Sequence, residues 1–320
     1  TTSKGKDFWL GFMAHINGTG SNSANMSLYI TSDSATTGTV SIPGQSWSLN
    51  FPVGKDSVTV VPIPNTTAYV GCTDCIQNKG IHVTSVLPIA MYAHIYRDYR
   101  SDATLVLPTA TAGKEYRVMT WSQETNNGSG DVVSKAVFMI VASSDNTKVR
   151  ITPANSTVQK ASGVWAVGTP YNITLNKGEI YQGMAPNRYD DLTGTLIEVI
   201  DTGSTASCKK VSVFSGNTGT SLGNCGGLNS KDNLYEQLFP VNSWSTDFLT
   251  VPYLGRSNDR YRVLATKDNT VVTINGTLAA ILQKGEFYQT GNVNKPQYIT
   301  SNNPISVAQF MNSQGCGGSR

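Results

Sequence analysis

The chain has 320 residues, of which only 14% are charged, and its 24 lysines and arginines against 21 aspartates and glutamates leave a net charge of +3. A balance this small gives no electrostatic footprint for nucleic acid or for an anionic membrane. Hydrophobic residues make up 39% of the sequence, which argues against disorder, and no apolar run approaches the ~20 residues that span a bilayer. We therefore expect a folded chain that neither binds nucleic acid nor spans a membrane.

Short runs rich in Val, Ile, Tyr and Phe follow one another along the chain, separated by Gly, Asn, Asp or Pro. Such runs are typical of β-strands, and signals for helices are nearly absent. Evenly spaced short strands predict an all-β fold of sandwich or barrel-like units. In chain order the clearest runs lie at residues 26–30, 39–42, 47–51, 137–141, 148–151 and 271–274.

The most informative feature is an internal repeat. VASSDNTKVRI at 141–151 matches LATKDNTVVTI at 264–274, and each indicates a strand, an Asp-Asn turn and a second strand. LNKGEIYQ at 175–182 likewise matches LQKGEFYQ at 282–289, and a weaker first copy surrounds Asp33. Self-similarity of this kind marks repeated structural units. Each copy closes with a strand, at 88–92, 210–214 and 304–308.

The repeat predicts three related β modules that pack together. We place them at residues 1–108, 109–240 and 241–320, and expect the third to be cut short at its C-terminal end. The junctions near Thr109 and Pro240 have no linker rich in Gly and Ser. The modules are therefore expected to pack rigidly against one another.

The turns of the repeat are expected to be structural. Asp33, Asp145 and Asp268 are each predicted at a hairpin turn, as are the two Lys-Gly-Glu segments, because Asp, Asn and Gly suit tight turns. One carboxylate per turn supplies too few oxygens for a calcium ion. No metal ion or other cofactor is therefore predicted.

The chain contains five cysteines. Cys72 and Cys75 have CxxC spacing, which fits a zinc site, a redox site or a small disulfide loop. The flanking residues indicate loops, and Cys208 with Cys225 does not repeat the spacing, so a Cys72–Cys75 disulfide is favoured over free thiols and over a metal or redox site. A second disulfide is predicted between Cys208 and Cys225, and Cys316 has no assigned partner.

Five short motifs, spread in order over nearly the whole chain, resemble those of the N-terminal domain of the IgGFc-binding protein family. The resemblance implies an extracellular β-rich module with a binding or adhesive role, no catalytic residues, and further domains in a larger cell-surface or secreted protein. The small number of cysteines favours a bacterial surface protein over the animal member. The motifs are GKDFWLGFM at 5–13, SDATLVLP at 101–108, YEQLFPVNSW at 235–244, YRVLATKDNT at 261–270 and PISV at 304–307.

No motif for catalysis is present. The three histidines do not form an HExxH or HxH pattern, and no GxSxG occurs. The carboxylates that could hydrolyse a glycosidic bond are Asp190, Asp191, Glu179, Glu236 and Glu286. The repeat explains Glu179 and Glu286, and the junction motif explains Glu236, which leaves little for an active site. No catalytic residue is therefore predicted.

Exposed aromatic and arginine side chains are the candidates for ligand contacts. Rings and guanidinium groups are enriched at recognition hot spots, and loops on a rigid β scaffold are where recognition usually occurs. The sequence places such residues in the string YRDYR and at two tryptophans flanked by small or polar residues. The predicted ligand-binding residues are Tyr96, Arg97, Tyr99, Arg100, Trp165 and Trp47.

The leading hypothesis is an extracellular, non-enzymatic binding or adhesion module that recognises a glycan or a protein. A structural stalk without a ligand of its own is the first alternative, because repeats can space an adhesive tip from a surface. A carbohydrate-active enzyme is the second alternative.

Overall fold

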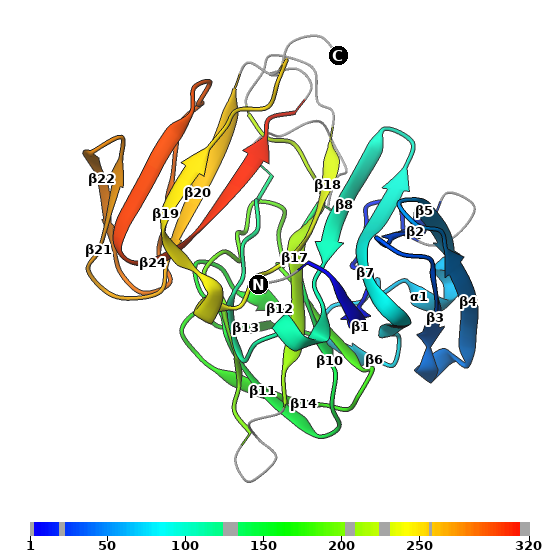
Figure 1. Ribbon diagram of the computed structural model, residues 1–320. Helices are drawn as coiled ribbons and strands as arrows, with labels where there is room; N and C mark the ends of the chain where they lie inside the picture. Colours follow the sequence, from blue (N-terminus) through cyan, green and yellow to red (C-terminus); the bar gives the residue numbers. More distant parts are fainter. Residues whose placement is uncertain are drawn as a thin grey trace.

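Nearly all regular structure in the protein is β-strand. The computed structural model describes residues 3–18, 23–123, 134–201, 209–223, 231–255 and 258–313. Their strands form three groups, and β17 (Val211–Thr220) and β18 (Asp232–Gln237) of the middle group lie near the centre of the molecule (Figure 1). The predicted all-β fold of three related β-sandwich modules packed together is confirmed.

Module 1 is built around one long strand, β7. The N-terminal half of β7 pairs with β1 and β3, and its C-terminal half pairs with β2 and β8, so that β7 belongs to two sheets at once. Strands β4 and β5 complete the two sheets. The elements are β1 (Gly5–Leu10), β2 (Asn25–Thr31), β3 (Thr36–Ile42), η1 (Pro43–Gln45), β4 (Trp47–Val53), β5 (Val58–Ile63), α1 (Asn65–Ala68), β7 (Ile81–Arg97) and β8 (Arg100–Val106).

Module 2 has a sheet β18-β17-β10-β15 and a facing sheet β14-β11-β16-β9. Strand β6 (Cys75–Gln77) leaves module 1 and pairs with β15 at the edge of the first sheet. The elements of module 2 are η2 (Thr109–Thr111), β9 (Glu115–Arg117), β10 (Ala136–Ala142), β11 (Thr147–Thr152), β12 (Val158–Gln159), β13 (Val164–Trp165), β14 (Tyr171–Leu175), β15 (Ile180–Met184), β16 (Leu196–Val199), β17 (Val211–Thr220) and β18 (Asp232–Gln237).

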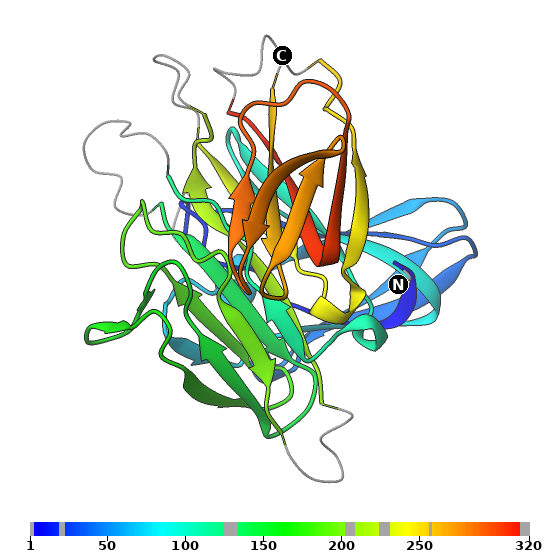
Figure 2. The same ribbon diagram turned by 90° about the vertical axis from the view of Figure 1, so that its left-hand side faces the viewer.

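Module 3 repeats the plan of module 1 around the long strand β24. The N-terminal half of β24 pairs with β19 and β21, and its C-terminal half pairs with β20. Figure 2 shows this module, in yellow to red, as a separate group of strands beside the green strands of module 2. The elements are η3 (Val241–Ser243), β19 (Ser245–Thr250), β20 (Asp259–Ala265), β21 (Thr270–Ile274), β22 (Thr277–Leu282), β23 (Phe287–Gln289) and β24 (Gln297–Met311).

The turns after Asp33, Asp145 and Asp268 are not hairpins, and that prediction was wrong. Strand β10 pairs with β15 and β17, whereas β11 pairs with β14 and β16, so the Asp145 turn crosses from one sheet to the other. In modules 1 and 3 the strands on either side of the turn, β2 with β3 and β20 with β21, likewise do not pair with each other, because β7 or β24 lies between them. The Lys-Gly-Glu segments are not hairpins either: the first connects β14 and β15, which lie in different sheets, and the second connects β22 and β23, which lie at opposite ends of one sheet.

The repeated residues hold two such crossing turns together. The backbone N–H of Lys177 donates to Asp145 Oδ1, and that of Lys284 donates to Asp268 Oδ1, both at 2.9 Å. The residue after each Asp is an Asn with a positive φ, 51° at Asn146 and 56° at Asn269, a conformation that Asn tolerates well. In module 1 the Asp33 carboxylate pairs instead with the ammonium group of Lys4 at 2.5 Å.

Modules 1 and 2 share a hydrophobic core. Met139, Val141, Phe214 and Tyr235 of module 2 pack into the buried cluster of module 1, and the Tyr235 hydroxyl donates to the carbonyl oxygen of Gly11 at 2.8 Å. The helices η2 and η3 begin directly after Pro108 and Pro240, where the sequence placed the module boundaries. Because strands and core residues cross between modules, the boundaries at 1–108, 109–240 and 241–320 remain a prediction.

Candidate functional site

The predicted residues Tyr96, Arg97, Tyr99 and Arg100 lie at the hairpin between β7 and β8. Tyr99 is 88% exposed and has φ 59°. Arg97 Nε lies 3.4 Å from Asp98 Oδ2, and Arg100 Nη1 donates to Asn17 Oδ1 at 3.0 Å. The two guanidinium groups therefore hold the hairpin and its neighbouring loop, and Tyr99 is the side chain that projects into solvent.

A row of apolar and aromatic side chains crosses the outward face of the same sheet. The strand register sets Val60 opposite Tyr29, Tyr29 opposite Tyr92, and Tyr92 opposite Leu105. Side chains directly opposite on neighbouring strands contact one another. Tyr92 is 47% exposed and Val60 is 51% exposed, so the row is open to solvent.

Two further rings extend this row towards Tyr99. His94 and Tyr96 point to the same face as Tyr92, because alternate residues of a strand share a face. Their rings stack with centroids 4.4 Å apart, and the His94 ring lies 5.7 Å from Tyr29. His94 Nε2 is 2.7 Å from the Ser101 hydroxyl, and burial lowers the pKa of the imidazole. We call this surface the aromatic face; it consists of Tyr29, Val60, Tyr92, His94, Tyr96 and Tyr99.

The sequence pointed to only part of this face. Tyr96 and Tyr99 were predicted, whereas Tyr29, Val60, Tyr92 and His94 were missed. The alternation of Tyr92, His94 and Tyr96 was the available signal. The contributions of β2 and β5 depend on pairing between distant segments, which the sequence does not display.

The two predicted tryptophans lie elsewhere, and the structure does not bring them together with the hairpin. Trp165 stacks on Tyr171 with centroids 4.2 Å apart, and its Nε1 donates to Asp74 Oδ1 at 3.0 Å. Lys160 Nζ lies 4.5 Å from the Trp165 ring centroid. Trp47 is partly buried against the core of module 1.

The predicted disulfide between Cys72 and Cys75 is present. Asp74, inside this loop, accepts hydrogen bonds from Trp165 and from the Tyr181 hydroxyl, the latter at 2.9 Å, and so fastens module 1 to module 2. Cys208, Cys225 and Cys316 lie outside the described residues. Within the described part of the chain, no group of three or more His, Cys, Asp or Glu side chains could hold a metal ion.

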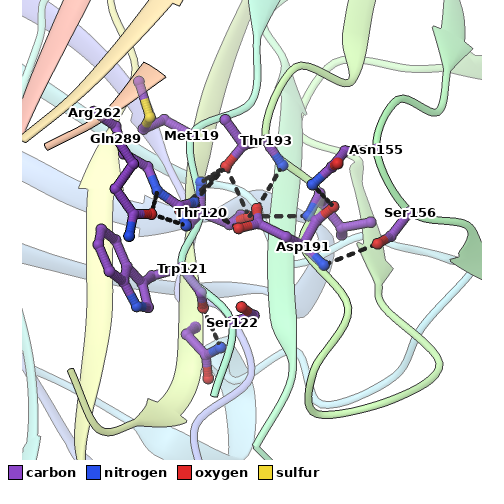
Figure 3. A network of polar contacts seen from close by, with 12 residues as sticks. Met119, Thr120, Trp121, Ser122, Asn155, Ser156, Asp191, Thr193, Arg262 and Gln289 are labelled. Atoms are coloured by element: carbon purple, nitrogen blue, oxygen red, sulfur yellow. Dashed lines mark hydrogen bonds and ion pairs between the residues drawn. The ribbon is translucent and has the colours of Figure 1, made fainter. Parts of the chain in front are cut away.

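A buried ion pair links module 3 to module 2 (Figure 3). Arg262 Nη1, from β20, lies 2.6 Å from Asp191 Oδ2 and donates to the Thr120 carbonyl oxygen at 2.5 Å. The guanidinium carbon lies 4.0 Å from the Trp121 ring centroid. Trp121 is fully buried. This network is closed to ligands and has a structural role.

A cleft of about 560 Å³ separates β18 from β24, and β8 lines its end. Burial raises the pKa of Asp102 to about 7 and that of Glu236 to about 8. Paired carboxyl groups of this kind occur in glycoside hydrolases. Here, however, both oxygens of Asp102 accept backbone N–H groups, from Tyr235 at 2.7 Å and from Ala103 at 2.9 Å. The carboxylate therefore serves to hold β8 against β18.

The family model described as IgGFc binding protein matches residues 102–320. The chain belongs to the IgGFc binding protein family. The resemblance stated from the sequence motifs is thereby confirmed. No curated protein and no solved structure matches the chain.

The IgGFc binding protein family is a binding, non-catalytic family whose members are typically extracellular. In this member the match covers modules 2 and 3 and most of β8. In the part of the chain that the structure describes, no helix is long and apolar enough to cross a membrane. The aromatic face lies almost wholly before the matched region.

Proposed function

We propose that this chain is an extracellular, non-enzymatic binding module of a larger surface or secreted protein, and that it recognises a protein ligand through the aromatic face. The observation that carries the proposal is the row of tyrosines left open on an otherwise complete sheet. Contiguous exposed apolar surface on a soluble domain marks interaction sites. Tyrosine supplies large contact area at a low cost in conformational entropy.

The shape of the aromatic face favours a protein over a glycan. With Leu105 beside it on β8, the row from Val60 crosses four neighbouring strands, spaced ~4.8 Å apart, and so extends about 14 Å across the sheet. Along β7 the five residue steps from Tyr92 to Arg97, at ~3.4 Å each, extend it about 17 Å, and the turn with Tyr99 follows. An area of this size matches the buried centre of a protein interface, which is larger than the contact of one sugar ring.

The test is a binding screen with the purified chain against an array of extracellular proteins and, in parallel, a glycan array. Immunoglobulin G Fc is included as one probe because the family name provides it. We expect selective binding of a protein that weakens about tenfold, or ~1.4 kcal/mol, in Tyr99→Ala and in Tyr92→Ala. Tyr189→Ala, at a tyrosine of module 2 that is 50% exposed, is the matched control and should bind normally.

Two results would count against this function. Binding to glycans alone would show that the ligand is not a protein. Protein binding that is unchanged in both tyrosine variants would show that the aromatic face is not the binding surface. A chain that binds nothing on either array would favour the structural stalk. The core shared by modules 1 and 2 and the buried Arg262–Asp191 pair give the rigidity that a stalk needs.

A further inference from the structure

Side chains from three distant segments meet beneath the β7–β8 hairpin. Arg100 Nη1 donates to Asn17 Oδ1 at 3.0 Å, and the backbone N–H of Asn17 donates to His15 Nδ1 at 2.9 Å. The side chain of Asn233, from β18, adjoins the His15 imidazole and favours its protonated form. We call these four residues, His15, Asn17, Arg100 and Asn233, the junction cluster, because they lie where module 1 meets module 2.

The junction cluster is buried, yet several of its polar atoms are unsatisfied. His15 is 4% exposed and Asn233 is 3% exposed. Among the described residues, His15 Nε2, Arg100 Nε and both polar side-chain atoms of Asn233 have no hydrogen-bond partner, so the contact between His15 and Asn233 lacks hydrogen-bond geometry. Buried polar groups in folded proteins are nearly always hydrogen-bonded. Four unsatisfied atoms in one place therefore indicate that the cluster holds a ligand.

Most of the unsatisfied atoms are donors. A backbone N–H can only donate, so His15 Nδ1 accepts from Asn17 and the proton of the neutral imidazole lies on Nε2. The imidazole is neutral because burial lowers its pKa. Arg100 Nε and Asn233 Nδ2 also carry only hydrogens to donate. The ligand is therefore an acceptor of N–H groups.

The junction cluster also carries a positive charge without a counter-ion. In the part of the chain that the structure describes, no carboxylate forms an ion pair with Arg100. Asp232 Oδ1 instead accepts the backbone N–H groups of Ser101 and Asn233. Burial and then the charge of Arg100 lower the pKa of the nearby Lys231. Since buried charges are normally paired, the missing acceptor is expected to be negatively charged.

We propose that the junction cluster binds one chloride ion. The ion accepts the N–H groups of His15 Nε2, Asn233 Nδ2 and Arg100 Nε, and it balances the guanidinium charge. A water molecule could accept the same groups but would leave that charge unbalanced, and N–H groups bind an ionised acceptor more strongly than a neutral one. Asn17 and Arg100 are partly exposed, so the ion reaches the cluster from the side of the hairpin.

The test is urea denaturation of the whole chain at constant ionic strength, with chloride replaced stepwise by the bulkier gluconate. A ligand that binds the folded state alone stabilises it, so the denaturation midpoint should rise with the logarithm of the chloride concentration. Arg100→Met should abolish this rise. Asn233→Asp should abolish it too, because the new carboxylate supplies the charge, and its midpoint without chloride should be no lower than that of the wild type.

Asn217→Asp is the matched control, at another buried asparagine of module 2. Asn217 Nδ2 donates to the Trp121 carbonyl oxygen at 2.7 Å, and Oδ1 accepts the N–H of Gly219 at 2.9 Å, so both side-chain atoms are satisfied. This variant should lose stability and keep the chloride dependence. Tyr92→Ala should also keep it, because the junction cluster acts independently of the aromatic face.

Bromide locates the ion. Crystals soaked in bromide should give an anomalous peak within hydrogen-bond distance of His15 Nε2 and Arg100 Nε. A midpoint that chloride does not change, a chloride dependence that Arg100→Met and Asn233→Asp both retain, or bromide found elsewhere as an adventitious ion only would overturn the proposal.

One further variant tests whether the chain supplies its own counter-ion. The acidic residues outside the described ranges are Glu124 and Asp131. Glu124→Gln combined with Asp131→Asn should leave the chloride dependence as in the wild type. A dependence that appears only in this double variant would show that a carboxylate of the chain fills the junction cluster, and the proposal would be wrong.

Discussion

Removal of the Arg262 side chain tests whether the buried ion pair fastens module 3 to module 2. Arg262 and Asp191 are separated by 71 residues in the sequence, and their side chains are nearly inaccessible to solvent. In Arg262→Ala the Asp191 carboxylate stays buried and loses its charged partner. Breaking a buried pair in this way costs about 3–5 kcal/mol, because the remaining charge is desolvated without compensation.

The geometry supports a value in the upper part of that range. Nη1 of Arg262 also donates to Thr193 Oγ1 at 3.0 Å, and Nε donates to Gln289 Oε1 at 3.0 Å, so several hydrogen bonds to a charged group are lost together. The ring contact with Trp121 is lost as well. The matched control is Arg260→Ala, two residues away on the same strand, whose guanidinium carbon is farther from Trp121, at 5.9 Å.

The assay is urea denaturation followed by tryptophan fluorescence, with module 3 expected to unfold first in the variant. We expect the free energy of unfolding to fall by about 4 kcal/mol in Arg262→Ala and by less than about 1 kcal/mol in Arg260→Ala. The double variant Arg262→Met with Asp191→Leu should recover part of the loss, because both buried charges are then absent. If the free energy of unfolding fell by less than ~1 kcal/mol in Arg262→Ala, the buried ion pair would not be what fastens module 3 to module 2.

Three further predictions concern the disulfide, the cleft and the modules. Cys72→Ser should destabilise the chain by about 2 kcal/mol, as expected for a very short loop; two free thiols in unreduced wild-type peptides, detected by mass spectrometry, would contradict the disulfide. The pKa of Glu236, raised to about 8, means that the folded state holds a proton which the unfolded state has released, so stability should fall as the pH rises from about 5 to about 8. In Glu236→Gln the free energy of unfolding, taken from denaturation curves at each pH, should fall less across this range. An unchanged dependence of stability on pH would argue against the raised pKa. Residues 109–240 expressed alone should aggregate more than residues 1–240, because β6 and β8 no longer cover the edges of β15 and β18; equal monomer fractions in gel filtration would disprove this.

The sequence predicted the fold class and the threefold repeat because both are recorded in local patterns. Strand-forming runs and the two copies of the Asp-Asn-Thr turn needed no knowledge of distant contacts. The error over hairpins has a physical origin: an Asp-Asn turn with one positive φ suits a hairpin and a crossing between sheets equally well. Only the long-range pairing of β10 with β15 and β17 decides between them.

The candidate site was less predictable for the same reason. Tyr99 could be chosen from its own neighbourhood, since a tyrosine in a polar hairpin has little to pack against. The aromatic face needs Tyr29, Val60 and Tyr92 to be brought side by side, and these residues come from three strands that are far apart in the sequence. The Arg262–Asp191 pair likewise joins two positions that share no local pattern.

Covered strand edges explain why modules 1 and 2 form one assembly. An unpaired edge is a template for association with other chains, and here modules cover the edges of their neighbours. Strand β6 of module 1 completes the sheet at β15. Strands β8 and β18 satisfy each other's backbone through side chains: Asp102 accepts from the Tyr235 N–H, and Gln237 Oε1 accepts from the Leu107 N–H at 2.8 Å. Because both kinds of cover lie at the junction of modules 1 and 2, separating these two modules would expose the edges of β15 and β18.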